Sequence, residues 1–301
     1  MNRWIKRGLL AVTAVLIVLV IAVVGAVQYS KVKSLRTLSI AAYSVALRDD
    51  AASLERGRYL YESRGCTDCH GVNGGGRTVI DDGKGMRVAG PNISPGPGSV
   101  VAHYKPEDWE RAIRHGVKPD GHPAFIMPSE EYNRFTDEDL AALVAWLRHM
   151  PPASGGAAVL ELPLPVRALY GLGVIKDAAE KIDHSLAPQQ PVAEGVTVAH
   201  GEYVANMCKG CHGPNLSGGK IPGGPPDWPA AANLTPGEGT AMKHYAAAEQ
   251  FIAMFRSGKR PDGTIVSKVM PFEALGKVSD TDVRALYLYL QGISPRPAGE
   301  R

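Results

Sequence analysis

The first apolar pattern along the chain is a long unbroken run close to its N-terminus. Residues 8–27 are twenty uncharged positions, most of them Val, Leu, Ile or Ala. As a helix this run is about 30 Å long, which matches the hydrocarbon core of a bilayer. A cleavable signal peptide has a shorter apolar core of about 7 to 15 residues. The pattern therefore predicts a retained transmembrane helix, although Gly25 and Ala26 offer a weak small-residue cleavage site.

Further along, apolar positions recur with helical spacing, and the two clearest helices share a start signal. Thr136 and Ser279 each precede acidic residues and then a helical apolar stripe, which occupies positions 140, 143, 144 and 147 in the first case and 283, 286, 287 and 290 in the second. A hydroxyl at the N-cap accepts a first-turn amide, and acidic groups suit the positive end of a helix. Shorter helical patterns upstream contain Gly57 and Gly201. We expect each to cross its capped helix at close range, because glycine has no side chain.

These matched helices belong to an internal repeat. The Pro-Asp-Gly at residues 119–121 recurs at 261–263, the segment 92–95 recurs at 233–236, and the His-Tyr pair at 103–104 recurs at 244–245. The repeat predicts two homologous all-α modules that follow the transmembrane helix. About 100 residues per module is an ordinary domain size.

The repeat divides the chain into four parts. We expect a membrane anchor with its juxtamembrane segment at residues 1–48, a first module at 49–152, a linker at 153–195 and a second module at 196–301. Pro and Gly mark the linker ends. The middle of the linker, residues 162–175, is strongly apolar but too short to span a bilayer. We expect it to pack across the two modules, with the membrane surface or a partner subunit as alternatives.

The strongest chemical signal is the placement of the cysteines. All four lie in two Cys-x-x-Cys-His segments, formed by Cys66, Cys69 and His70, and by Cys208, Cys211 and His212. This segment is the attachment signal for c-type haem. Two cysteines three apart can form thioethers to one porphyrin, and the adjacent histidine then ligates the iron. The sequence predicts two covalently bound haems.

Structural zinc and thiol redox chemistry also use Cys-x-x-Cys pairs. A zinc ribbon places its second pair about 15 to 20 residues after the first, whereas here the first cysteines of the pairs are 142 residues apart. A thioredoxin-like dithiol needs a strand and helix context that neither pair has. The histidine directly after each pair favours haem.

A second axial ligand is predicted about sixty residues after each cysteine pair. The matched segments 116–128 and 258–271 both end in Met-Pro, at Met127 and Met270. Proline gives its preceding residue an extended backbone, so each methionine lies on a stiff loop. Most methionines only fill gaps in a core, but recurrence in both modules favours iron ligation. The fallback ligands are His103, His115, His122 and His244.

With these motifs, both modules resemble class I cytochrome c domains, over about residues 52–152 and 196–294. The pair resembles membrane-anchored dihaem cytochromes c and is similar to the cytochrome c subunits of periplasmic dehydrogenases. Those subunits typically have three haem modules, whereas this chain has two. The resemblance implies that the haems are attached on the outer side of the membrane. We therefore expect a single-pass protein of the cytoplasmic membrane with both modules on the periplasmic side.

Charge adds one exclusion. The chain has 33 basic and 30 acidic residues, and seven of the basic ones precede residue 49, where there is no acidic residue. The remainder is therefore slightly acidic. Because nucleic-acid binding needs a concentrated basic face, no nucleic-acid partner is expected.

The function expected from these features is electron transfer rather than catalysis. Two filled axial positions leave no substrate site on either iron, and axial methionine raises the reduction potential. We expect a redox protein donor and acceptor, drawn from dehydrogenases, quinol-oxidising complexes, soluble cytochromes and terminal oxidases. The alternatives are a dihaem enzyme of the peroxidase type with one iron that opens, and a fixed electron-transfer subunit of a dehydrogenase complex. A thiosulfate-oxidising cytochrome would need a cysteine ligand, and no fifth cysteine exists.

Overall fold

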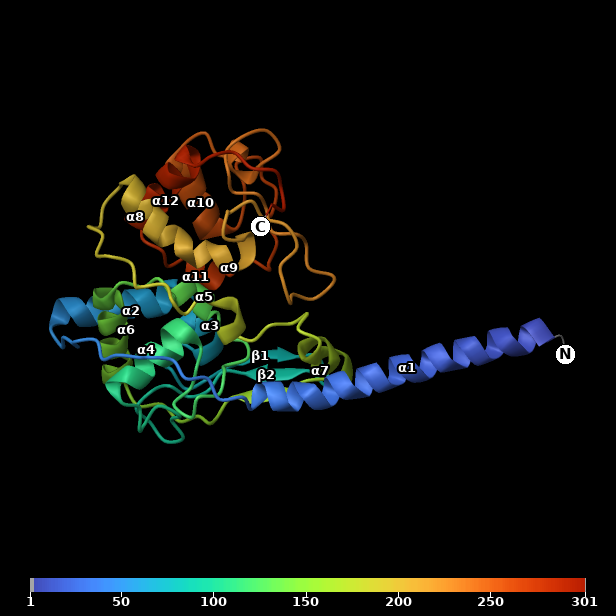
Figure 1. Cartoon of the computed structure of the whole chain (residues 1–301). Coiled ribbons are helices and arrows are strands. Elements are labelled where there is room, and N and C mark those ends of the chain that lie inside the picture. Colours follow the sequence, from blue (N-terminus) through green and yellow to red (C-terminus); the bar gives the residue numbers. More distant parts are fainter. Residues whose placement is uncertain (1–2, 301) are drawn as a thin grey trace.

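The computed structural model describes residues 3–300 and has two helical bodies stacked on each other (Figure 1). A long helix, α1 (Arg3–Ser34), projects from the first body as an isolated rod. It is the one helix within residues 3–300 that is long and apolar enough to cross a membrane. The expected all-α fold with an N-terminal apolar helix is confirmed. The outermost residues of the expected anchor and second module, 1–2 and 301, lie outside the described range.

The first module surrounds one hydrophobic core. Its helices are α2 (Ala51–Ser63), α3 (Cys66–His70), α4 (Pro106–His115), α5 (Ser129–Tyr132) and α6 (Asp137–His149). Leu60, Leu140 and Val144 are almost fully buried in this core. An extended segment, residues 36–49, follows α1, and we call it the strap. It lies along the first module, and its Val45 is buried in the same core. The strap thereby fixes the base of α1 to the first module.

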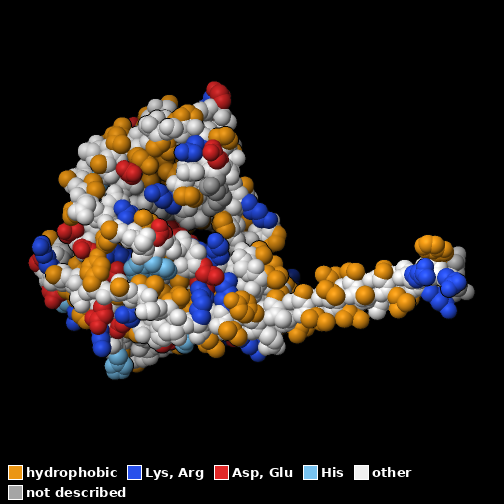
Figure 2. Space-filling view, viewed as in Figure 1, with side chains coloured by type: hydrophobic (Ala, Val, Ile, Leu, Met, Phe, Trp, Pro, Cys, Tyr) orange, Lys and Arg blue, Asp and Glu red, His pale blue; other side chains and the backbone are white. Residues whose placement is uncertain are grey.

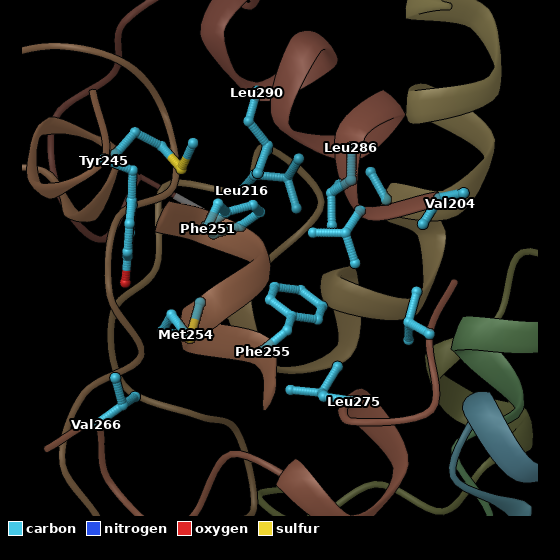
Figure 3. Packing of buried hydrophobic residues seen from close by; sticks show 14 residues of the cluster. Val204, Leu216, Tyr245, Phe251, Met254, Phe255, Val266, Leu275, Leu286 and Leu290 are labelled. Atoms are coloured by element: carbon cyan, nitrogen blue, oxygen red, sulfur yellow. The ribbon is translucent and has the colours of Figure 1, made fainter. Parts of the chain in front are cut away.

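The second module repeats this arrangement. Its helical elements are α8 (Val198–Ala205), η2 (Asn206–Cys208), α9 (Lys209–His212), η3 (Ala241–His244), α10 (Ala248–Ser257), α11 (Phe272–Leu275) and α12 (Asp280–Gly292). Figure 3 shows Leu286 and Leu290 of α12 with Phe251 and Phe255 of α10 in its core. The core therefore lies between the last helix and the helix that precedes the Met270 loop.

Both predicted helix starts and both predicted close crossings are confirmed. Thr136 Oγ1 accepts a hydrogen bond from the Asp139 amide, and Ser279 Oγ accepts one from the Asp282 amide, each at 3.1 Å. A Cβ atom added at Gly57 would lie 2.0 Å from a backbone oxygen of α6, and one added at Gly201 would lie 2.0 Å from a backbone oxygen of α12. The first and last helices of each module therefore touch backbone to backbone.

A small antiparallel sheet joins the first module to the linker and was not expected from the sequence. Its strands are β1 (Thr78–Asp81), β2 (Arg87–Ala89) and β3 (Val159–Glu161), in the order β1-β2-β3. The third strand comes from the linker, and Val88 on the central strand is buried. Strands of three or four residues give too short a pattern to be recognised from alternation alone.

The two modules contact each other reciprocally. The hydroxyl of Tyr59 in α2 donates to Asp282 of α12 at 2.7 Å, and the hydroxyl of Tyr203 in α8 donates to Asp139 of α6. Each hydroxyl also accepts the backbone amide of the opposite N-cap residue, Ser279 at 3.0 Å and Thr136 at 3.3 Å. A tyrosine of each module thus completes the N-terminus of the last helix of the other.

A buried ion pair reinforces one side of this interface. Arg64, at the end of α2, contacts Asp282 at 2.6 Å, and the two side chains are 4% and 0% exposed. His200 of α8 lies 2.7 Å from the other oxygen of the same carboxylate. Burial alone would raise the pKa of Asp282, but Arg64 and the hydrogen bonds from Tyr59 and His200 lower it to about 2. The carboxylate is therefore charged and held by three partners.

The apolar part of the linker, residues 162–175, packs on α1 and the first module, which corrects the expectation that it packs across the two modules. Its helix α7 (Leu164–Gly171) lies against the C-terminal part of α1, and Tyr170 contacts Phe125 of the first module. The turn that follows contains η1 (Ala179–Lys181) and bonds to the first module through the Ala178 amide. The apolar linker segment thus joins α1 to the first module only.

The backbone contact at Gly201 predicts a large effect of one added methyl group. Gly201→Ala places Cβ against the Ala285 oxygen, so α8 and α12 must separate and the core of the second module loosens. We expect the free energy of unfolding, measured by urea denaturation, to fall by about 1–3 kcal/mol. The matched control is Gly292→Ala at the end of α12, where no atom lies within 4 Å of the added Cβ. It should be neutral or stabilise by at most about 1 kcal/mol, and equal effects at the two positions would contradict the close crossing.

The buried ion pair predicts that Arg64 contributes more to stability than a surface arginine of the same helix. Arg64→Ala leaves Asp282 buried without its cation, which we expect to cost about 3–5 kcal/mol. Arg58 pairs with Glu55 and Glu62 on the exposed face of α2, so Arg58→Ala should cost under about 1 kcal/mol. Urea denaturation of both variants at neutral pH compares the two. A loss at Arg64 no greater than at Arg58 would refute the buried pair.

Candidate haem sites

The first Cys-x-x-Cys-His segment forms the short helix α3, which lies between two glycines with left-handed φ. Gly65 precedes it with φ +79° and Gly71 follows it with φ +73°. The Tyr61 hydroxyl donates to the Gly71 oxygen and closes the turn onto α2. A Cβ atom added at Gly90 would lie 2.1 Å from the Cys69 oxygen, so a second loop crosses the turn closely. The turn is therefore held from both sides.

The second segment occupies the corresponding place in the second module. It runs through η2 and α9, and Gly213 follows it with φ +81°. Its first cysteine, Cys208, packs against the core of the second module, as Cys66 packs against the core of the first. The two turns correspond in the packing of their first cysteine and in the glycine that follows, although the first is one helix and the second is divided between two.

A backbone carbonyl orients each histidine. His70 Nδ1 lies 3.0 Å from the Pro91 oxygen, and His212 Nδ1 lies 2.7 Å from the Ala232 oxygen. Because a carbonyl only accepts, each Nδ1 carries the proton and the lone pair is on Nε2. Histidines that ligate metals commonly donate their other ring N–H to a carbonyl in this way.

Residues 92–95 and 233–236 share an Asn-x-Ser/Thr-Pro motif that lies directly after those carbonyls. The sequence gave no indication of its role. Asn92 donates to the Pro97 and Ala153 oxygens at 3.0 and 2.9 Å. Asn233 donates to the Arg296 oxygen at 2.8 Å. In both modules the asparagine side chain also accepts the amide two residues on, at 2.9 Å. Each motif therefore fixes the loop directly after the carbonyl that bonds to the histidine.

The two Met-Pro loops also correspond. The carbonyl of Met127 accepts the amide of Ser129 and that of Met270 accepts the amide of Phe272, both at 2.9 Å, and a one-turn helix follows each proline. Met127 packs against the same hydrophobic cluster as Cys66, and Met270 against the same cluster as Cys208. Each module thus brings one cysteine and its Met-Pro methionine onto one apolar core.

Burial disfavours the thiolate form of the first cysteine in each pair. It raises the pKa of both Cys66 and Cys208 to about 12. Reactive cysteines instead have lowered pKa values. Within residues 3–300, no group of three or more His, Cys, Asp or Glu side chains is placed to hold a metal ion. Neutral thiols beside an oriented imidazole fit covalent attachment of a haem.

The fallback histidines are placed less favourably. His115 lies 3.3 Å from Glu110 and 2.9 Å from His184 of the linker. His122 lies 3.1 Å from Asp120. His103 and His244 are exposed at the surface. The methionines on the apolar cores remain the preferred second ligands.

Each attachment turn also lies against the other module. Helix α5, which follows Met127, contacts η2 and α9, and helix α11, which follows Met270, contacts α3 and α2. A Cβ added at Gly210 would come within 2.4 Å of the Glu131 carboxylate, so the glycine leaves room for this side chain. Burial raises the pKa of Glu131 to about 8. On the opposite side, Glu273 of α11 pairs with Arg77 at 3.2 Å. The sequence gave no signal for these contacts.

Comparison with protein-family models gives one match in each half. Residues 52–147 match the family described as cytochrome c oxidase, cbb3-type, subunit III, and residues 198–294 match the cytochrome c family. Each match covers the helices that carry a cysteine pair and its Met-Pro loop.

Curated relatives agree with this division. The chain is 27% identical to the gluconate 2-dehydrogenase cytochrome c subunit of Pantoea cypripedii, over 88% of this chain and 65% of the relative. It is 25% identical to the cytochrome c subunit of the quinone alcohol dehydrogenase of Gluconobacter oxydans, over 83% and 57%. A dihaem cytochrome c of Cereibacter sphaeroides is 26% identical, over 79% of this chain and 85% of its own length. The chain therefore spans less than two thirds of the two dehydrogenase subunits.

Two family matches, two corresponding turns and two corresponding methionine loops lead to the same conclusion. The chain belongs to the c-type cytochromes and contains two cytochrome c domains.

Proposed function

We propose that this protein relays single electrons through two haems between a membrane or periplasmic donor and a downstream oxidase or cytochrome. Haem bound at both turns would supply the one-electron iron couple for this relay. The observation that carries the proposal is the reciprocal contact between each attachment turn and the helix after the Met-Pro loop of the other module. The contact supports a relay because both Cys-x-x-Cys-His turns lie at the interface between the modules.

The two cysteine motifs and the two Met-Pro loops supply the residues that would hold the cofactors. In the first module Cys66 and Cys69 would tether the porphyrin, and His70 and Met127 would ligate the iron. In the second module the same roles belong to Cys208, Cys211, His212 and Met270. The Pro91 and Ala232 carbonyls keep the imidazoles in the ligating tautomer.

Filled axial positions would make this protein a carrier and not an enzyme. A peroxidase-type activity needs one iron with an axial position that can open. Both modules have the same kind of Met-Pro loop, so neither is distinguished as the one that would open. Helices α5 and α11, which follow Met127 and Met270, also contact the opposite module. That packing supports methionines that stay in place.

We further propose that α1 anchors the protein in the cytoplasmic membrane as a single span, with both modules on the periplasmic side. The uncharged run 8–27 has the length of a bilayer core. The side chains of residues 8–25 project from an isolated rod and are exposed (Figure 2). An exposed apolar surface of that extent requires lipid or a partner around it.

For the donor we propose a dehydrogenase, because two of the relatives are cytochrome c subunits of dehydrogenases. Two arrangements satisfy this proposal: a mobile relay, or a fixed subunit of a larger complex. Affinity purification from detergent-solubilised membranes separates them. A dehydrogenase that co-purifies in equal amount indicates a fixed subunit, whereas its absence, with second-order reduction of the purified cytochrome, indicates a relay.

Replacement of each candidate methionine tests the ligand assignment. Met127→Leu and Met270→Leu keep an apolar side chain but remove the thioether. Each should abolish about half of the near-infrared methionine-to-iron absorption and lower the potential of only one of the two haems. A visible and near-infrared redox titration of the full chain measures both effects.

Two buried core methionines serve as matched controls. Met150→Leu in the first module and Met254→Leu in the second should leave the bands and potentials unchanged, because both side chains lie in the cores. If Met127→Leu and Met270→Leu also leave them unchanged, the ligands are other residues. A high-spin haem in the unmodified protein would instead indicate a peroxidase-type enzyme.

A further inference from the structure

We propose that α7 and the turn after it, residues 164–175, form a second membrane contact that lies in the outer bilayer interface beside α1. The proposal rests on the proposed anchoring by α1. It concerns a part of the linker that neither cytochrome c domain includes. We call this part the α7 segment.

The position of the α7 segment along α1 sets its depth. A Cβ atom added at Gly171 would lie 2.0 Å from the Ala26 oxygen, so the two helices meet backbone to backbone there. Ala168 is buried against Ala26 and Val27 in a small separate cluster. Ala26 and Val27 end the apolar run, which begins at Gly8 and is about 30 Å long as a helix. The α7 segment therefore lies where the span leaves the hydrocarbon core.

Polar contacts fix the segment at that level. Lys33 donates to the Tyr170 oxygen at 2.9 Å and pairs with Glu180 at 2.9 Å. Arg36 forms two hydrogen bonds to Asp177, at 2.6 and 2.9 Å, and the Tyr170 hydroxyl donates to the same carboxylate at 2.7 Å. Asp177 is fully buried in this network. The charged groups thus gather on the side of the first module, where α1 has already left the apolar run.

The segment also has large apolar side chains that are exposed. Leu164, Leu172 and Val174 are 63%, 61% and 62% exposed, and Leu169 is 40% exposed. Arg167 is the only charged residue between positions 162 and 175. Isolated exposed leucines are ordinary at a protein surface. These four side chains, however, belong to one short segment that packs directly against α1.

The occupant that fits this surface is lipid. In Figure 2 apolar side chains continue from the rod of α1 onto the body where α7 lies. An apolar helix with its polar contacts on the other side suits the boundary between headgroups and acyl chains. Two contacts in place of one would restrict rotation about α1 and hold the first module next to the bilayer.

Photocrosslinking in membranes tests the contact on the full chain. A p-benzoylphenylalanine residue is placed at Leu172 and, in a second variant, at Val174, and the haem-loaded protein is reconstituted into vesicles of phosphatidylethanolamine and phosphatidylglycerol. Leu16→p-benzoylphenylalanine within α1 is the positive control. Ile265→p-benzoylphenylalanine is the negative control, because this side chain of the second module is 72% exposed. The visible spectrum of each variant confirms that both modules are folded.

We expect lipid adducts at positions 172 and 174 in yields several times that at 265 and comparable to that at 16. Adducts at 16 without adducts at 172 and 174 would overturn the second contact and leave the anchor intact. No adduct at 16 would refute the anchor itself. In native membranes, an adduct between position 172 or 174 and another protein, in place of lipid, would show that a partner subunit covers this face and would overturn the proposal.

Discussion

The reciprocal tyrosine contacts between the two modules are the constraint on which the arrangement of the candidate sites depends. The first helix of each module donates a tyrosine hydroxyl to an aspartate in the first turn of the last helix of the other, at 2.7 Å for Tyr59 and Asp282 and 2.6 Å for Tyr203 and Asp139. The same hydroxyl accepts an N-cap amide that has no partner inside the helix. Two otherwise independent domains are therefore joined at the ends of the helices that form their cores.

These tyrosine contacts bring the two Cys-x-x-Cys-His turns to the same interface. The short helix after each Met-Pro loop packs against the turn of the opposite module, so a change in one module reaches the other directly. The two sides are not identical. Glu131 approaches the second turn at Gly210, whereas the corresponding position of the first turn is Asp68, whose pKa is raised by burial and by nearby Glu273. Such differences in nearby carboxylates and burial are means by which a protein gives two haems different potentials.

The modules also differ in what surrounds them. Only the first is held by the strap after α1, extended by the small sheet and joined to the linker helix, while the second contacts the rest of the described chain mainly through the first. The first module is thus the one attached to α1, and the second module is stacked on the first (Figure 1). In the proposed membrane setting, this arrangement gives a partner in the bilayer and a partner in the periplasm different modules to approach.

The sequence alone determined the local features, because each depends on residues close together in the chain. It predicted the long apolar helix and the two caps at Thr136 and Ser279, and the structure confirms these. The internal repeat and the absence of a glycine side chain predicted the two modules and the two close crossings, which are also confirmed. The cysteine and methionine motifs also gave the candidate ligands, which remain predictions. Only the tertiary structure decided how distant parts meet: which carbonyl orients each histidine, which module completes each helix terminus, and that the linker lies on α1 and not between the modules. Periodicity and capping depend on neighbouring residues. A contact such as that between Arg64 and Asp282 joins residues far apart in the chain, so it forms only when both modules have folded.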